Sequence, residues 1–455
     1  MKKRTVIRLL ACVLLVAMAI LGCSCNDAAN DTEGDATEAP KLLVRALRVK
    51  VDAAKGEFLG IKDVEVLEVE RSLAPDDYLT ATNEIVGRAL LSDVKAGDVI
   101  GDSMLAAKKG TNKEEISIPL AKKLGFIVVT DYLEPNTGED LSAKIQELID
   151  KYPRKTIFFP DGVYTIARPI KTSSNPQKAV SLHLSGFAVI KASNSWKGGD
   201  DHMIQLGAID ETFTIDQTGS NYYMYGGVID GNRKAKALIL EGGRETSVRQ
   251  ISIKNAIQGL KIAYNQVYGS NDCDFEAIDI EGCYLPGSVG VHVDGLDNTL
   301  TDIRISGFEI GMQLTRAGNL MHNIHAVYKR GERMDYNNSI GFLDSCGSNW
   351  MDGFHAEGFR VAYRIKGGGL DMLNDCVASW SDPEATAQTA IMTDGRFSSI
   401  VTNFKAEFGE GASCMFLDLG AEGGKGVIQY PIFDKSKVNN TSYMNHLVGK
   451  VIWNS

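Results

Sequence analysis

The chain has 455 residues, a formal net charge of −10 at pH 7, and 46 glycines against only 11 prolines. This length exceeds one ordinary hydrophobic core, so we expect two domains or one elongated repeat array. The acidic balance argues against general nucleic-acid binding, and we expect no nucleic-acid partner.

The N-terminus carries a basic segment followed by an apolar run at residues 9–21, which is too short to cross a bilayer as a mature helix. The run ends at Ile20-Leu21-Gly22-Cys23. This pattern resembles a bacterial lipoprotein signal peptide at residues 1–22. The resemblance implies cleavage after Gly22 and lipidation of Cys23, and the acyl chains would anchor the protein to the membrane.

Residues 23–40 are rich in Asp, Glu and small residues, a composition that cannot bury a core. We predict a flexible acidic tether. Similar tethers follow the lipid in some surface-exposed gram-negative lipoproteins, so we expect a protein anchored to the outer membrane and exposed at the cell surface.

Residues 41–110 form the first predicted folded unit. Three segments occur in an order that resembles the SAF domain, a small β-clip module. In chain order they are the segment 50–56, the alternating stretch 64–69 and the run 86–105. In that family the module assists carbohydrate binding or assembly. The resemblance therefore implies an accessory module without catalysis of its own.

The second unit begins near residue 125. Apolar residues at helical spacing predict a helix over 141–150, and Thr156-Ile-Phe-Phe-Pro-Asp-Gly-Val-Tyr-Thr-Ile166 predicts strand, turn and strand. Together with Gly226-Gly-Val-Ile-Asp-Gly-Asn232, this resembles the pectate-lyase-like superfamily over residues 125–455. The implied fold class is all-β: a right-handed single-stranded parallel β-helix with an N-terminal capping helix, behind the small β-clip domain. Tailspikes share this fold, so a homotrimer is left open.

Seven short segments of the second half support this fold independently, because they align with apolar residues at i and i+2. Their first apolar residues are separated by 27, 25, 21, 30, 22 and 28 positions, as in a coil-stacked solenoid. The segments begin at Gln250, Ala277, Asp302, Asn323, Gly353, Asp375 and Asn403.

Alternation in these strands predicts an outward column that contains Arg304, His325, His355 and Lys405. Stacked strands lie about 4.8 Å apart, so the first three side chains would occupy successive rungs. We expect His325 or His355 to act as a base and Arg304 and Lys405 to bind an anionic substrate. Glu357 would orient an imidazole or bind substrate.

The coil after His325 is the longest and contains Tyr328, Arg330 and Arg333. We expect Tyr328 to be the catalytic acid and the two arginines to bind carboxylates or sulfates. Trp350 is either a sugar-stacking platform or a cap on the solenoid edge. No cofactor is firmly implied, although a divalent cation such as calcium would suit the glutamates.

The carboxylate and histidine motifs of family 28 glycosidases and the calcium pectate-lyase triad are absent from these coils. Our leading hypothesis is β-elimination on a uronic-acid-containing, possibly sulfated polysaccharide, such as a glycosaminoglycan or pectin-like glycan. A glycoside hydrolase and a non-catalytic glycan-binding or adhesion protein are the alternatives. A second face, with His292, Arg364 and Lys366, is the reserve site.

Overall fold

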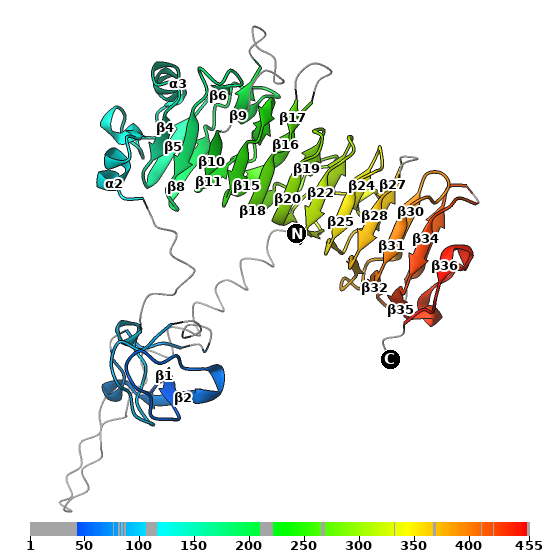
Figure 1. Ribbon diagram of the computed structural model, residues 1–455, viewed down its shortest axis with the longest axis horizontal. Coiled ribbons are helices and arrows are strands. Elements are labelled where there is room, and N and C mark those ends of the chain that lie inside the picture. The colour runs from blue at the N-terminus through cyan, green and yellow to red at the C-terminus, as the bar shows by residue number, and fades with distance from the viewer. Residues whose placement is uncertain are drawn as a thin grey trace, which may run out of the picture. The chain divides into compact units, whose positions relative to one another are not determined.

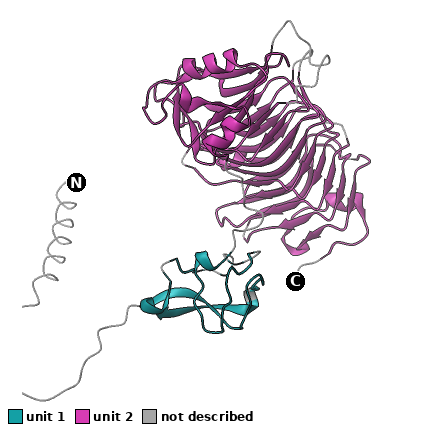
Figure 2. Cartoon of the chain, turned by 60° about the vertical axis from the view of Figure 1, so that its left-hand side comes forward, with its two compact units in different colours: residues 1–113 teal, residues 114–455 magenta. Residues whose placement is uncertain are grey.

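A computed structural model describes residues 43–452, apart from residues 76, 81, 83–84, 86–87, 106–115, 210–221, 265–268, 332, 367–369, 411 and 422. The predicted signal peptide, the tether and Cys23 lie outside the described residues. The chain divides into two compact units, residues 1–113 and 114–455 (Figure 2). None of the helices in the described ranges is long and apolar enough to span a membrane.

The first unit is built on an antiparallel pair, β1 (Leu43–Val49) and β2 (Val64–Glu70). Single bridges then join Arg48 to Val99 and Ala53 to Val94, so the run 88–105 folds back toward the pair. The described part of this unit also contains the short 3-10 helices η1 (Ile61–Asp63), η2 (Arg71–Leu73) and η4 (Asp102–Met104). A small apolar core that includes Leu47, Leu90 and Ile100 holds the unit together.

The second unit begins with helices that cover the first coil. They are α2 (Ile118–Lys123), η5 (Val129–Asp131) and α3 (Ser142–Lys151), and they lie at the β4 and β5 end of the sheet stack (Figure 1). The helix α3 buries Ile145, Leu148 and Ile149 in the main core, which gives the capping helix that the apolar spacing predicted.

Three parallel faces make up the remainder, and strands of successive coils are paired in register. Face A contains β3 (Ile127–Val128), β4 (Thr156–Phe159), β7 (Ser181–Leu184), β10 (Tyr223–Tyr225), β14 (Ser247–Arg249), β22 (Leu320–His322), β25 (Trp350–Asp352), β28 (Met372–Asn374), β31 (Ile400–Thr402), β34 (Val427–Gln429) and β36 (Leu447–Val448). Face B contains β5 (Gly162–Ile166), β8 (Ala188–Ala192), β11 (Val228–Asp230), β15 (Ser252–Ala256), β23 (His325–Val327), β26 (His355–Glu357), β29 (Val377–Ser379), β32 (Lys405–Glu407) and β35 (Ile432–Phe433). Two long strands, β18 (Asp274–Gly282) and β20 (Thr299–Ser306), run through both faces.

Face C is a separate sheet. Its strands are β6 (Ile170–Ser173), β9 (His202–Ala208), β12 (Lys236–Leu240), β16 (Leu260–Ile262), β19 (Val289–Val293), β21 (Ile310–Leu314), β24 (Ile340–Asp344), β27 (Val361–Ile365), β30 (Ala387–Thr393) and β33 (Ser413–Leu419). The minor elements are β13 (Gly243–Arg244), β17 (Ser270–Asn271), η7 (Tyr336–Asn338), η8 (Lys435–Lys437) and η9 (Ser442–His446). These coils confirm the predicted all-β parallel β-helix.

One left-handed residue turns the chain from face A to face B in each of these coils. The seven corner residues have φ between 50° and 68°, and they are the residues that begin the seven aligned segments: Gln250, Ala277, Asp302, Asn323, Gly353, Asp375 and Asn403. Asn, Asp and Gly tolerate this conformation best, since their side chains clash least with the backbone. The corner explains why polar or small residues precede the apolar alternation in most of the segments.

Candidate functional site

The outward column on face B forms in the predicted order. Arg304 pairs in register with His325, and His325 pairs with His355. Val377 occupies the next rung, and Lys405 follows it. We call Arg304, His325, His355 and Lys405, with the neighbouring Glu357, Ser379 and Glu407, the histidine row.

The two histidines stack face to face in this row. Their ring centroids are 4.5 Å apart and the ring planes differ by 6°. The in-register parallel strands β23 and β26 impose this geometry, because side chains at matched positions of adjacent rungs point the same way. Both side chains are half-buried on the outward surface.

Each imidazole reaches a residue on the next rung, two positions further along the strand. His325 Nε2 is 3.2 Å from Glu357 Oε2, and His355 Nε2 is 2.7 Å from Ser379 Oγ. A carboxylate can only accept this hydrogen bond, so Nε2 of His325 donates it. The row therefore contains one histidine held by a carboxylate and one held by a hydroxyl.

Burial lowers the pKa of His355, and the neighbouring His325 lowers it further. Two stacked imidazoles cannot both be protonated without repulsion, so the His355 ring is neutral at neutral pH. A neutral, solvent-facing imidazole is competent to accept a proton.

The charged residues at the two ends of the row differ in their pairing. Arg304 is exposed, and its side chain makes no hydrogen bond or ion pair with the part of the chain that is described. Lys405 pairs with Glu407 of its own strand. Lys405 and Glu407 also line a pocket of about 270 Å³ with Asp434 and Lys437.

Tyr328 is placed differently from our prediction. Its side chain is 7% exposed and packs against Tyr336 and Phe359, and its hydroxyl is buried without a hydrogen-bond partner among the described residues. Burial raises its pKa. The role of Tyr328 as the catalytic acid is therefore wrong, because the hydroxyl cannot reach a substrate on the outer face.

The predicted arginines of the long loop are not equivalent. Arg330 forms a hydrogen-bonded ion pair with Asp382, lies 3.7 Å from Glu384, and stacks over the Tyr336 ring. Arg330 therefore joins two loops, and its guanidinium already pairs with carboxylates of the protein itself. Arg333 is exposed.

Trp350 belongs to face A and not to the histidine row. It is 43% exposed and stands between Leu320 and Met372, its in-register neighbours. The corner at Gly353 turns the chain from face A to face B, so Trp350 and His355 lie on different faces, and the stacking role of Trp350 stays a prediction. Residues that are close in sequence are separated here by a bend.

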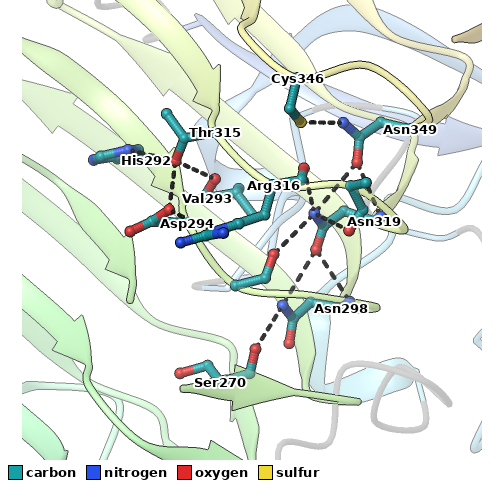
Figure 3. Close-up of polar contacts among 12 residues, drawn as sticks. Ser270, His292, Val293, Asp294, Asn298, Thr315, Arg316, Asn319, Cys346 and Asn349 are labelled. Atoms are coloured by element: carbon teal, nitrogen blue, oxygen red, sulfur yellow. Dashed lines mark hydrogen bonds and ion pairs between the residues drawn. The ribbon is translucent and has the colours of Figure 1, made fainter. Parts of the chain in front are cut away.

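The reserve site on face C is a network of paired side chains (Figure 3). His292 Nε2 lies 3.2 Å from Thr315 Oγ1, and that hydroxyl donates to Asp294 Oδ1 at 2.7 Å. Arg316 donates to the same carboxylate oxygen at 3.3 Å. Burial and the nearby Lys261 lower the pKa of His292. Arg364, in the same outward column, donates two hydrogen bonds to Asp394.

A buried ladder of amides between faces C and A was not predicted. Asn298 donates to Asn319, and Asn319 donates to Asn349, each through Nδ2 to Oδ1 (Figure 3). Asp371 takes the next position, where Asn349 N donates to its Oδ1. The sequence carried a signal for this ladder, because each of these residues directly precedes a face A strand.

The five cysteines of the β-helix, Cys273, Cys283, Cys346, Cys376 and Cys414, are unpaired. Cys376 is buried in the interior as the alternation predicts.

Comparison with known families finds one match, and it covers the first unit. Residues 44–106 match the SAF domain. No curated protein matches the chain. Among solved structures, the Family 28 exopolygalacturonase of Yersinia enterocolitica is 11% identical with a TM-score of 0.48, and the match covers 81% of each chain.

Two further structures are similar. A tailspike double mutant of E. coli bacteriophage HK620 is 14% identical with a TM-score of 0.48, over 71% of this chain and 68% of the tailspike. The catalytic domain of a GH87 alpha-1,3-glucanase, solved with tetrasaccharides, is 12% identical with a TM-score of 0.49, over 86% of this chain and 78% of that domain. The chain therefore contains a SAF domain at residues 44–106, and a parallel β-helix follows it.

Proposed function

We propose that this protein is a surface lipoprotein that cleaves a uronic-acid-containing polysaccharide by β-elimination at the histidine row. The observation that carries the proposal is the stacked pair His325 and His355, one rung from the exposed guanidinium of Arg304. Adjacent rungs are about 4.8 Å apart, so the part of the row from Arg304 to His355 spans about 9.6 Å, the width of one or two sugar rings.

Elimination needs the uronate carboxylate neutralised, the C5 proton removed and the leaving oxygen protonated. Arg304 supplies a bidentate donor for the carboxylate. His355 is the base, because its lowered pKa keeps the imidazole neutral and able to accept the C5 proton. The electron pair of that bond forms the C4–C5 double bond as the C4–O4 bond breaks.

His325 replaces Tyr328 as the group that protonates the leaving oxygen. The proton it transfers is the one on Nδ1 of the imidazolium form, because Nε2–H is hydrogen-bonded to Glu357; the ring centroids of His325 and His355 are 4.5 Å apart. The carboxylate of Glu357 holds the orientation of the His325 ring through Nε2. Base and acid therefore come from neighbouring rungs of one face.

The test is a screen of acidic glycans for an unsaturated product that absorbs in the ultraviolet. We expect absorbance from a uronate-rich glycan, and loss of at least about 100-fold in rate for His355→Ala. His322→Ala on face A is the matched control, since His322 is exposed and pairs with Asp352 away from the row. Absence of the absorbance with every uronate-rich glycan would refute the proposal.

A glycoside hydrolase is the second candidate, and the placement of Glu357 and Glu407 favours it. These carboxylates stand two rungs apart in one outward column, with Ser379 between them. Two rungs correspond to roughly 9.6 Å, near the upper limit for an inverting pair. Reducing ends without ultraviolet absorbance, lost in both Glu357→Gln and Glu407→Gln, would select this candidate. Glycan affinity without product would instead select a binding protein.

The membrane anchor is part of the same proposal and rests on residues 1–40 of the sequence. Cys23→Ala should move the protein from the detergent phase to the aqueous phase in a Triton X-114 partition of expressing bacteria. Unchanged partition would remove the lipoprotein assignment while leaving the enzyme proposal in place.

A further inference from the structure

The histidine row contains a set of metal-ligand atoms. Nε2 or Nδ1 of His325 and His355 and a carboxylate oxygen of Glu357 all lie within 4.8 Å of one another. Among the described residues this is the one group of three or more His, Cys, Asp or Glu side chains close enough to hold an ion. All three side chains are half-buried, so water and ions have access to them.

The chemistry of the three ligands selects a class of metal. Two imidazoles and one carboxylate are a ligand set of catalytic zinc sites, in which a fourth position stays open for water or substrate. Calcium takes six to eight oxygen ligands, and this cluster supplies one carboxylate. The calcium that we considered from the sequence is therefore a poorer fit than a zinc-class ion.

The ligand atoms are close enough, but the rings must reorient, because the lone pairs of two rings whose planes differ by 6° do not converge on one ion. A zinc ion about 2.1 Å from each nitrogen requires ligand atoms roughly 3.4 Å apart. The His325 and Glu357 atoms are already at 3.2 Å. His355 must release Ser379 Oγ and tilt its ring toward His325, a side-chain motion on an open face that leaves β23 and β26 in place.

We infer that the histidine row binds one divalent transition-metal ion of the zinc class through His325, His355 and Glu357. Metal binding uses the same imidazole lone pair that would accept the C5 proton. The ion and proton abstraction therefore exclude each other, and the metal inhibits elimination; this second statement rests on the proposed function.

Cobalt titration of the full chain tests the site without any substrate. After treatment with a chelator and its removal, we expect Co²⁺ to give visible absorption bands that saturate at one ion per chain, with Zn²⁺ displacing it. Affinity should fall about tenfold or more in His325→Gln, His355→Gln and Glu357→Gln. His322→Gln should bind like the parent, because His322 and Asp352 offer only two ligands. A circular dichroism melt of each variant shows that it is folded.

Two results would overturn the inference: no saturable Co²⁺ binding, or binding that the three row substitutions leave unchanged. If the protein binds metal but makes no unsaturated product from any uronate, the metal site stands and the proposed function fails. If it makes product at an unchanged rate with Zn²⁺ saturating, the inhibitory part fails and the lyase stands.

Discussion

Asp371→Asn should stabilise the β-helix, because Asp371 is a buried carboxyl beside a second one. Asp371 and Asp344 are both 0% exposed. Asp344 accepts hydrogen bonds from Cys346 N, Gly347 N and Asn349 Nδ2 at 2.6–2.7 Å. Asp371 Oδ1 accepts one from Asn349 N, while Oδ2 has no partner in the part of the chain that is described. Asp344 has three hydrogen-bond donors and Asp371 has one, so Asp371 takes the proton.

The energetic cost of Asp371 follows from this protonation. Burial and the charge of Asp344 raise the pKa of Asp371 to about 8. An unfolded Asp has a pKa of about 3.9, so between pH 4 and pH 8 the folded chain holds a proton that the unfolded chain has released. Stability therefore falls as pH rises through this window, and at pH 7 the loss relative to pH 4 is on the order of 4 kcal/mol.

Asparagine keeps the carbonyl that accepts from Asn349 and replaces Oδ2 with an amide donor beside the Asp344 carboxylate. It extends the Asn298, Asn319 and Asn349 ladder by one rung without an ionisable group. We expect the variant to be more stable than the parent by about 2–4 kcal/mol at pH 8 and by much less at pH 5.

Urea unfolding of both proteins at pH 5, 6, 7 and 8, followed by circular dichroism, measures this difference. The parent midpoint should decline with pH, and the Asn variant should show a flatter profile. Asp279→Asn is the control, since Asp279 is exposed on face B. A variant that is equally or less stable at pH 8, or that keeps the parent slope, would refute the assignment of the proton to Asp371.

Three other predictions concern the corners and the row. Ala277→Asn should raise the free energy of unfolding by about 0.5–1 kcal/mol, since Ala277 has φ 56° and Asn tolerates this conformation; no gain in a urea titration would contradict this. Tyr328→Phe should keep full activity and gain about 1 kcal/mol by removing a buried hydroxyl that lacks a partner; a large loss of rate would restore the hydroxyl to the mechanism. On the acid side, the rate of elimination should fall as the pH drops below the lowered pKa of His355, so the acid limb of the kcat/KM profile should have a midpoint under 6.5; a midpoint above that value would assign the base to another group.

The architecture could be predicted because strand alternation and coil length are local properties. Period two places Arg304, His325 and His355 outward whatever the length of the intervening loops, and the register bears this out. The same alternation places Tyr328 inward, three positions after His325. Treating Tyr328 as part of a solvated loop was the error, since β23 ends at Val327 but the inward direction continues for one more residue.

The pairings across coils could not be predicted in the same way. Asp344 lies in the inward column, in register with Leu314 and Ile365, where a charged residue is unexpected. It is tolerated because the turn amides of Cys346 and Gly347 and the side chain of Asn349 all donate to it. Those donors come from a turn whose conformation is not encoded by strand alternation.

Coil length and site geometry are independent in this fold, and this independence is why the histidine row tolerates irregular repeats. His325 and Glu357 are 32 residues apart and His355 and Ser379 are 24 apart, yet both pairs have the same relation: next rung, two positions on. The additional residues go into the loop that Arg330 ties to Asp382, outside the strands. Ladder hydrogen bonds fix the rung spacing, while loops vary over the surface. The chemistry of the row is therefore set by which residues occupy matched outward positions of β20, β23, β26, β29 and β32, and loop length affects what covers the row without moving its imidazoles.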